Sequence, residues 1–246
     1  NNTKIVSLVG ESNISGMLPD IKNINKLIKN KTEAIFILDG EQLVPHREID
    51  VQDLDIDFLC VSGHKMLGPT GIGVVWGKKE LLEKMDPVYG GGDMIEEVYY
   101  DKATWAPIPH KFEAGTPPYV EAIGLGAAVD YLSDLTMAEV QKHSDHLRLY
   151  AKNTLENING INIIHTDSEN AGCTFAMSVD GVHATDISLM LDTYGVAVRA
   201  GHHCVQPFHR KLNIDATFRA TGYIYNDEKD FDTLANAIED SLKILR

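Results

Sequence analysis

The feature that most constrains this chain is a lysine in a short glycine-rich loop between two apolar runs. Asp57–Val61 precedes the loop and Ile72–Trp76 follows it, and both runs have the length and composition of buried strands. Lys65 is therefore either an ordinary surface lysine or a desolvated amine that attacks an aldehyde to form a Schiff base. Ser62 and His64 beside it could hold a phosphate, because the loop glycines let backbone N–H groups approach an anion.

A second stretch upstream supports the Schiff-base interpretation. Ala34–Leu38 is a further apolar run of strand length, and Asp39 follows it directly. An aspartate at the carboxyl end of a buried strand is the kind of partner that the pyridinium nitrogen of pyridoxal phosphate (PLP) needs. With Asp39 and Lys65 in this arrangement, the chain resembles the class V aminotransferase group of fold-type-I PLP enzymes.

The composition argues against several classes of protein. Among 246 residues, 43% are hydrophobic and 24% are charged, which is typical of a soluble globular protein. The formal net charge of −14 argues against a nucleic-acid-binding surface, and no apolar run approaches the ~20 residues of a membrane span. Three sparse cysteines indicate a reducing compartment, and Cys60 and Cys173 lie in apolar runs where we expect buried, unreactive thiols.

The order of apolar patterns predicts an α/β fold with two domains. Strands that alternate with helices imply a mainly parallel sheet, with ligands at the carboxyl ends of its strands. We expect residues 1–135 to form the first domain and residues 136–246 a smaller α+β domain, with a long irregular segment from Asp86 to Pro118. The further expected elements are strands at Lys4–Val9, Ile161–Ile164, Thr174–Val179 and Val196–Val198, and helices at Ile21–Ile28, Glu121–Leu132, Met137–Ile158, Thr185–Leu191 and from Asp227 onward.

A second reactive loop follows the strand expected at Val196–Val198. Cys204 lies there between histidines and polar residues, a setting that favours the nucleophilic thiolate. The sequence leaves two other interpretations open: a metal site formed by His202, His203, Cys204 and His209, or a purely structural pair of histidines. Arg199 and Arg219 could clamp a carboxylate in bidentate fashion, or each could form a surface ion pair.

Seven ordered motifs extend the resemblance over essentially the whole chain. They are SNISG, DGEQLVPH, SGHKMLGPTGIG, GGGDMI, FEAGTP, RAGHHCVQP and RATGYIYN. Together they are similar to the C-terminal part of the group II cysteine desulfurases of the SufS type. The resemblance implies an incomplete PLP-binding large domain in residues 1–135 and a small domain in residues 136–246 that carries the reactive cysteine.

The resemblance also implies a role for each matching residue. Lys65 would bind PLP covalently and, once released, move a proton as the catalytic base, with His64 beside it. Asp39, Gln42, Ser62, His64 and Thr116 would bind the cofactor, and the position of Thr116 implies a homodimer because its match reaches the phosphate in the other subunit. Asn13 and Arg219, with Arg199 beside them, would bind the substrate carboxylate, and Cys204 would receive the sulfur. No metal is expected.

The implied activity is sulfur transfer from L-cysteine, giving L-alanine and an enzyme persulfide. A sulfur-acceptor protein of the SufE or SufU type would then take the sulfur for iron–sulfur cluster assembly. The implied location is a bacterial cytoplasm or a plastid-type stroma, with the protein soluble and in contact with neither membrane nor nucleic acid. Two alternatives remain: a selenocysteine lyase of the same family, or a non-catalytic binding module that lacks the cofactor.

The chain departs from the family pattern in three places, and two of them, Glu41 and the missing N-terminal portion, support the non-catalytic alternative. Glu41 occupies the position of a small residue beneath the cofactor ring, and Gly10 replaces a common histidine. The chain also begins almost directly with a strand, without the long N-terminal portion of the family, which carries further cofactor contacts. We therefore expect the chain to be a truncated or processed product that is catalytically incomplete by itself.

Overall fold

The structure is a computed structural model that describes residues 2–164 and 170–246. Its chain divides into two compact units. The first comprises the segment ending at Leu8 together with Ile21–Glu41 and Asp50–Asp134, and the second comprises Val9–Asp20, Gln42–Ile49 and Leu135–Arg246. Two short N-terminal segments thus belong to the same unit as the C-terminal half of the chain.

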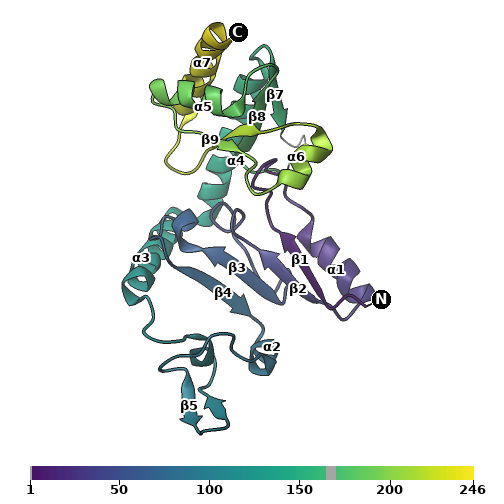
Figure 1. Cartoon of the computed structure of the whole chain (residues 1–246), viewed down its shortest axis with the longest axis vertical. Helices are drawn as coiled ribbons and strands as arrows, with labels where there is room; N and C mark the ends of the chain where they lie inside the picture. Colours follow the sequence, from purple (N-terminus) through teal and green to yellow (C-terminus); the bar gives the residue numbers. More distant parts are fainter. Residues whose placement is uncertain (1, 165–169) are drawn as a thin grey trace. The chain divides into compact units, whose positions relative to one another are not determined.

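The first unit is built on a four-stranded sheet in the order β1-β2-β3-β4 (Figure 1). β2 and β3 pair in parallel, whereas β3 and β4 pair antiparallel. β4 runs back along β3 through residues 63–72, a connection shorter than the crossover that a parallel pair needs. The α/β class is confirmed, with a mixed sheet. The strands are β1 (Ile5–Val9), β2 (Ile35–Asp39), β3 (Phe58–Ser62) and β4 (Gly73–Gly77).

Alternation along β2 fixes the core of the first unit. Phe36 and Leu38 are fully buried while the residues between them are half-buried, the pattern of a strand packed on one face. The buried carboxylate of Asp57 accepts the Phe36 N–H at 2.8 Å and pairs with Lys78 at 2.8 Å, which offsets its desolvation. The helices of this unit are α1 (Ile21–Lys31), α2 (Lys79–Lys84) and α3 (Tyr119–Leu135), with single 3₁₀ turns η1 (Gly63–Met66) and η2 (His110–Phe112).

A two-stranded antiparallel hairpin lies within the segment that the sequence predicts to be irregular. It consists of β5 (Ile95–Val98) and β6 (Ala103–Trp105). The prediction is wrong here because every residue of β5 is exposed, so no buried face imposed an alternating pattern on the sequence. The register of the pair also shifts between Ile95 and Glu97, which shortens the regular part.

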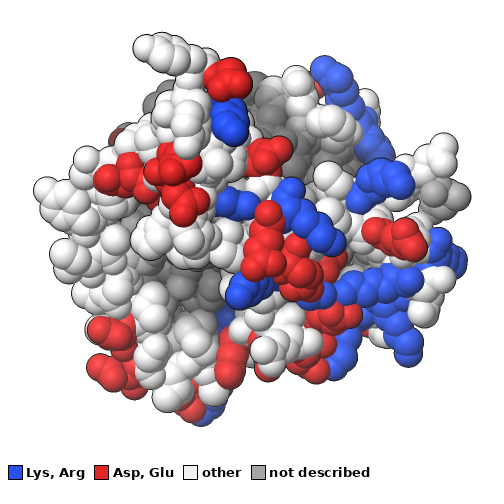
Figure 2. All heavy atoms as spheres, turned by 90° about the horizontal axis from the view of Figure 1, so that it is seen from below, with Lys and Arg blue, Asp and Glu red and all other residues white. Residues whose placement is uncertain are grey.

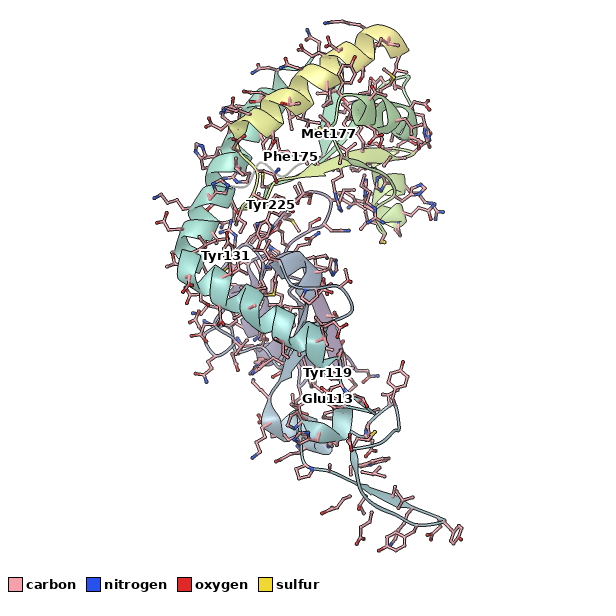
Figure 3. The ribbon with its side chains drawn as sticks, turned by 90° about the vertical axis from the view of Figure 1, so that its left-hand side faces the viewer. Glu113, Tyr119, Tyr131, Phe175, Met177 and Tyr225 are labelled. Carbon is pink, nitrogen blue, oxygen red and sulfur yellow. The ribbon has the colours of Figure 1, made fainter. Side chains whose placement is uncertain are left out.

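The second unit has its own sheet, in the order β7-β8-β10-β9, with antiparallel pairing throughout. Phe175 and Met177 of β8 point into its core, where Phe218 of β10 is also fully buried (Figure 3). The strands are β7 (Ile161–Ile164), β8 (Thr174–Val179), β9 (Arg199–Gly201) and β10 (Thr217–Thr221).

Among the described residues of the second unit, four helices accompany the sheet. The apolar residues predicted along the last helix, Phe231, Leu234, Ile238 and Leu242, are all buried, and a capping box at Asp227 starts this helix. The helices are α4 (Met137–Glu156), α5 (Ala184–Thr193), α6 (Gln206–Leu212) and α7 (Glu228–Leu245). No helix within the described residues is long and apolar enough to span a bilayer.

Two local predictions in this unit are wrong. The strand expected at Val196–Val198 lies instead at Arg199–Gly201, because β9 pairs with β10 only from Arg199 onward. The short helix α6 has no counterpart in the prediction, since its seven residues are too few for a helical period to stand out.

Charges of both signs lie interspersed on the face of the molecule that is drawn in Figure 2. The face drawn in Figure 2 carries acidic groups among basic ones rather than a continuous basic surface. Ion pairs such as Lys78–Asp55 and Lys29–Asp55 hold part of this charge in the first unit.

A buried polar cluster ties the N-terminal segments of the second unit to α4. Arg47 pairs with Asp145 at 2.8 Å, and Glu11 lies next to this pair with 4% of its surface exposed. Burial raises the pKa of Glu11 to about 8, although the charge of Arg47 opposes the shift. A Cβ at position 172 would overlap the Glu11 carboxyl group, so Gly172 is the residue that leaves room for it.

Glu11 should make stability depend on pH. Its pKa of about 8 in the folded state lies above the ordinary value of 4.5. Between these two pH values the folded state holds a proton that the unfolded state has released. The free energy of unfolding should then fall as pH rises, by at most about 1.4 kcal/mol per pH unit. Glu11→Gln should flatten this slope in denaturant titrations.

The measurement is best made between about pH 7.5 and 8.5. There His46 and His203, whose pKa values burial lowers to about 4 in the folded state, are neutral in the folded state and almost fully neutral in the unfolded state, where their ordinary pKa is 6.5, so they add little slope. Glu113→Gln, a change at an exposed position (Figure 3), is the matched control and should keep the wild-type slope. Equal slopes for wild type and Glu11→Gln would contradict the assignment.

Candidate active site

Lys65 lies in the 3₁₀ turn η1 at the carboxyl end of β3. The turn closes through a hydrogen bond from the Gly68 N–H to the Gly63 carbonyl at 3.0 Å, and Leu67 has a left-handed φ of 65°. A Cβ on Gly68 would come within 2.9 Å of the Leu125 side chain of α3, so the loop packs too closely on that helix for a larger residue. The glycines thus fix the turn that carries the lysine.

Asp39 reaches the same edge of the sheet from β2. β2 and β3 run parallel with Asp39 opposite Cys60, and the Gly40 N–H donates to the Cys60 carbonyl at 2.9 Å. Carboxyl ends of parallel strands meet at one edge, so the structure brings Asp39, Ser62 and Lys65 together within the first unit. Asp39 and Ser62 are half-buried, and His64 is exposed.

Glu41 contacts the lysine directly. Its Oε2 lies 3.1 Å from the Lys65 Nζ, and its backbone N–H donates to Asp39 Oδ1 at 3.0 Å. Because about a third of each side chain is exposed, the ion pair contributes no more than about 1 kcal/mol. The sequence marks Glu41 as an unusual residue, whereas its pairing with Lys65 emerges only from the structure.

Two other residues predicted to bind the cofactor are Thr116 and Gln42. Thr116 is exposed, in the short stretch between Glu113 and Tyr119, which are labelled in Figure 3. Gln42 is half-buried in a turn that belongs to the second unit. The roles of Thr116 and Gln42 in cofactor binding therefore stay predictions.

Cys204 lies in the second unit, between β9 and α6, and its side chain is exposed. The backbone around it is unusual: Gly201 has a φ of 127°, and His203 and Cys204 have left-handed φ values of 51° and 63°. Two consecutive non-glycine residues in this region carry strain, which surrounding contacts must offset. Such strain is frequent where a reactive side chain is held at a surface.

The predicted substrate-binding residues gather around this loop. Asn13 Nδ2 donates to the His203 carbonyl at 2.8 Å, and Arg219 Nη1 donates to the Asn13 carbonyl at 2.7 Å. Arg199 and Arg219 are opposite each other in the β9–β10 pair. Burial, and then the like charge of Arg199, lower the pKa of Arg219, while the charge of Cys204 acts in the opposite direction. Two neighbouring guanidinium groups of this kind would be stabilised by an anion.

The histidines near Cys204 are held by protein contacts. His203 Nε2 lies 3.1 Å from the Thr217 carbonyl, and His209 Nε2 lies 3.0 Å from the Thr217 hydroxyl. Burial lowers the pKa of His203 to about 4. Across the described part of the chain, no three His, Cys, Asp or Glu side chains are grouped so as to hold a metal ion. No local sequence pattern points to Thr217, because its contacts come from strand pairing.

The two other thiols differ in their surroundings. Cys173 is buried, as predicted, and burial raises its pKa to about 12. Cys60 is only half-buried, which corrects the prediction of a buried thiol, because β3 shields just part of its side chain. Burial, and then the charges of Asp39 and Glu41, nevertheless raise the pKa of Cys60, so its thiolate is disfavoured.

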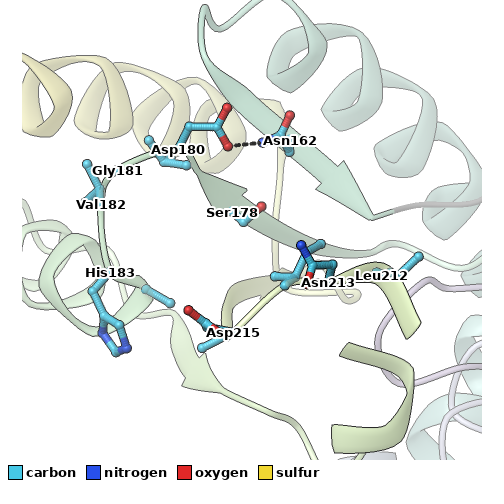
Figure 4. Close-up of a pocket in the computed structure, with 13 residues that line it drawn as sticks. Asn162, Ser178, Asp180, Gly181, Val182, His183, Leu212, Asn213 and Asp215 are labelled. Atoms are coloured by element: carbon cyan, nitrogen blue, oxygen red, sulfur yellow. Dashed lines mark hydrogen bonds between the residues drawn. The ribbon is translucent and has the colours of Figure 1, made fainter. Parts of the chain in front are cut away.

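A cavity of about 550 Å³ lies in the second unit, where β8 ends and α5 begins (Figure 4). Asp180 and Asn162 hydrogen-bond to each other at its rim, at 3.0 Å. None of the predicted site residues lines it. Its further polar lining comes from Ser178, His183, Asn213 and Asp215.

Comparison with protein families places this geometry among known enzymes. Residues 1–234 match the family described as aminotransferase class-V. A probable cysteine desulfurase of Halalkalibacterium halodurans is 46% identical over 237 residues, covering 96% of this chain and 58% of that protein. The cysteine desulfurase of Haloferax volcanii is 44% identical, covering 97% of this chain and 56% of that protein. The chain thus spans less than two thirds of these relatives.

Solved structures share the fold over nearly the whole chain. The cysteine desulfurase CsdA of Escherichia coli superposes with a TM-score of 0.93 at 38% identity, covering 99% of this chain and 60% of that one. A cysteine desulfurase of Thermococcus onnurineus superposes with a TM-score of 0.92 at 31% identity, covering 98% of this chain and 60% of that one. A cystine C–S lyase at 21% identity, with a TM-score of 0.83, shares the fold alone.

The three thiols should differ in their reaction with an alkylating reagent. We expect iodoacetamide to modify Cys204 first in the native chain, because it is exposed and lies near Arg219. Cys60 should follow slowly, and Cys173 should react only on unfolding. Mass spectrometry of peptides at timed intervals gives the order, and modification of Cys173 ahead of Cys204 would contradict it.

Proposed function

Because the chain belongs to the aminotransferase class-V family, we propose that it is part of a PLP-dependent cysteine desulfurase. The enzyme would transfer sulfur from L-cysteine to Cys204 and release L-alanine. The observation that carries this proposal is the exposed Cys204 in its left-handed loop, close to Arg219 and the neighbouring Arg199. An accessible thiol near fixed positive charge suits nucleophilic attack on sulfur.

The groups around Lys65 fit PLP by their chemistry. Asp39 offers a carboxylate whose Oδ1 is already oriented by the Glu41 N–H, and Ser62 and His64 offer donors for a phosphate. When bound, PLP supplies an aldehyde for the lysine and a ring that accepts electrons from the substrate. Asp39 would keep a proton on the ring nitrogen, and the freed Lys65 amine would accept the Cα proton of the substrate.

The ion pair between Glu41 and Lys65 affects how the site can bind PLP. Its carboxylate pairs with Lys65 at 3.1 Å, and an ion pair favours the charged amine over the neutral amine that attacks an aldehyde. Covalent capture of PLP therefore competes with the ion pair. This contact also favours a second candidate function, a non-catalytic module of the same fold that does not retain PLP.

Residues of the second unit would handle the substrate and its sulfur. Asn13, Arg199 and Arg219 would hold the carboxylate of cysteine, since paired guanidinium groups bind carboxylates well. The Cys204 thiolate would attack the substrate sulfur: an S–S bond forms and the C–S bond breaks. The electron pair stays with the substrate carbon, which takes up a proton on the way to alanine. In the first unit, His64 would act beside Lys65 as a further catalytic residue.

The remaining assignments follow from the same proposal. Residues 1–135 would form part of a PLP-binding large domain, and residues 136–246 a small domain with the cysteine loop. Thr116 and Gln42 would complete cofactor binding, Thr116 in a second copy of the chain, which makes the enzyme a homodimer. Sulfur would pass from Cys204 to an acceptor of the SufE or SufU type for iron–sulfur cluster assembly, in a bacterial cytoplasm or a plastid-type stroma.

Lys65 should be the residue that retains PLP. After incubation with PLP and gel filtration, the wild-type chain should keep a visible absorbance band from lysine-bound cofactor, and Lys65→Ala should lose it. Lys79→Ala changes an exposed lysine on α2 and should behave as wild type. An equal band in wild type and Lys65→Ala would overturn the assignment. Absence of a band from the wild-type chain would favour the non-catalytic module.

Cys204 should be the thiol that gains sulfur. After brief exposure of the complete, PLP-loaded enzyme to L-cysteine, mass spectrometry should find one added sulfur on the peptide that contains Cys204. Cys204→Ser should lose both this mass and alanine release, by a factor of at least about 10², and still retain PLP. Cys60→Ser is the matched control and should react normally. Added sulfur on Cys60 or Cys173 alone would contradict the proposal.

A further inference from the structure

The Cys204 loop has a backbone conformation that must be held in place. His203 and Cys204 both have left-handed φ values, of 51° and 63°, which non-glycine residues seldom adopt and almost never in succession. Such a conformation persists only when contacts on either side over-determine it. The question is therefore which groups hold the loop.

The upstream end of the loop is bound to β10. The ring of His203 is 6% exposed, and its Nε2 lies 3.1 Å from the Thr217 carbonyl. A carbonyl oxygen only accepts, so Nε2 carries the proton and donates it. The backbone carbonyl of His203 accepts in turn from Asn13 Nδ2 at 2.8 Å. Both the side chain and the backbone of the residue before Cys204 are thus engaged.

The downstream end is bound through His209 of α6, whose side chain is almost completely buried. Its Nδ1 lies 3.3 Å from the carbonyl of Val205, the residue directly after Cys204, and must donate to it. Its Nε2 is then the acceptor of a hydrogen bond from the Thr217 hydroxyl, at 3.0 Å. The rings of His202 and His203 lie 5.7 and 6.2 Å from that of His209, centroid to centroid.

We propose that His209 and Thr217 are positioning residues that hold the Cys204 loop by both of its ends. Thr217 uses its carbonyl for the residue before Cys204 and its hydroxyl for the histidine that binds the residue after it. Neither side chain is assigned contact with cofactor or substrate. The importance of His209 and Thr217 for sulfur transfer rests on the proposed function, whereas their effect on the position of the loop does not.

The test is hydrogen exchange of the backbone amides at neutral pH. Thr217→Val removes the hydroxyl and leaves His209 Nε2 buried without a donor, and His209→Phe removes both hydrogen bonds. In each variant we expect peptides covering 202–209 to exchange about tenfold faster or more. The amides of Val205 and Phe208, which donate to His202 and Val205 carbonyls, are the reporters. Peptides from β8 should keep the wild-type rate.

Two further variants separate positioning from general loss of stability. Thr217→Ser keeps the hydroxyl and should restore slow exchange in the loop. Thr174→Val removes a buried threonine hydroxyl from β8 of the same sheet and should leave the loop unchanged. Unchanged exchange at 202–209 in Thr217→Val, or an equal rise in every peptide, would overturn the proposal. Thr217→Val is the milder change and decides the question should His209→Phe fail to fold.

A separate readout keeps this inference distinct from the proposed function. The persulfide on Cys204 is measured by mass in the unmodified protein loaded with PLP and cysteine. Its absence there would count against the desulfurase, while the exchange rates of the loop would still decide whether His209 and Thr217 hold it. If the unmodified protein forms the persulfide, Thr217→Val and His209→Phe should form it more slowly while they bind the same amount of PLP.

Discussion

The parallel pairing of β2 with β3 is the constraint on which the first unit depends. With Asp39 opposite Cys60, both strands end at one edge, and the chain leaves each strand there in a tight turn. The Gly40 N–H continues the ladder by donating to the Cys60 carbonyl. A shift by one residue would turn Phe36 and Leu38 out of the core, so burial of these side chains fixes the register that brings Asp39 and the Lys65 turn together.

In the second unit, the strand that positions the functional residues is β10. It pairs with β8 on one side and β9 on the other, and its successive residues serve different purposes. Phe218 is fully buried in the core, while Thr217 holds the histidines and Arg219 reaches Asn13. Because successive residues of a strand face opposite sides, one strand can both anchor the core and present polar groups to the reactive loop.

The sequence predicted what local patterns determine. The strands beside Asp39 and Lys65 and the apolar stripe of α7 follow from residues close in the chain, although β4, which follows Lys65, is largely exposed and not buried as predicted. What it could not predict depends on pairing between distant segments. β9 was misplaced because its partner β10 fixes its position, and the β5–β6 hairpin has no buried face to leave a pattern. Lys111 is buried because its ammonium donates to the carbonyls of Glu83 and Met85, a contact without any local signal.

In the proposed reaction, Asn13 would couple substrate binding to the position of the Cys204 loop. Its side-chain amide is engaged by the His203 carbonyl, and its own carbonyl by Arg219. A substrate carboxylate that took the Asn13 amide or the Arg219 guanidinium would have to compete with these contacts. Substrate binding would thus remove one restraint at the upstream end of the Cys204 loop, while the ties to Thr217 and His209 remain. The loop would become freer when a sulfur atom is present to attack, without leaving β10 and α6.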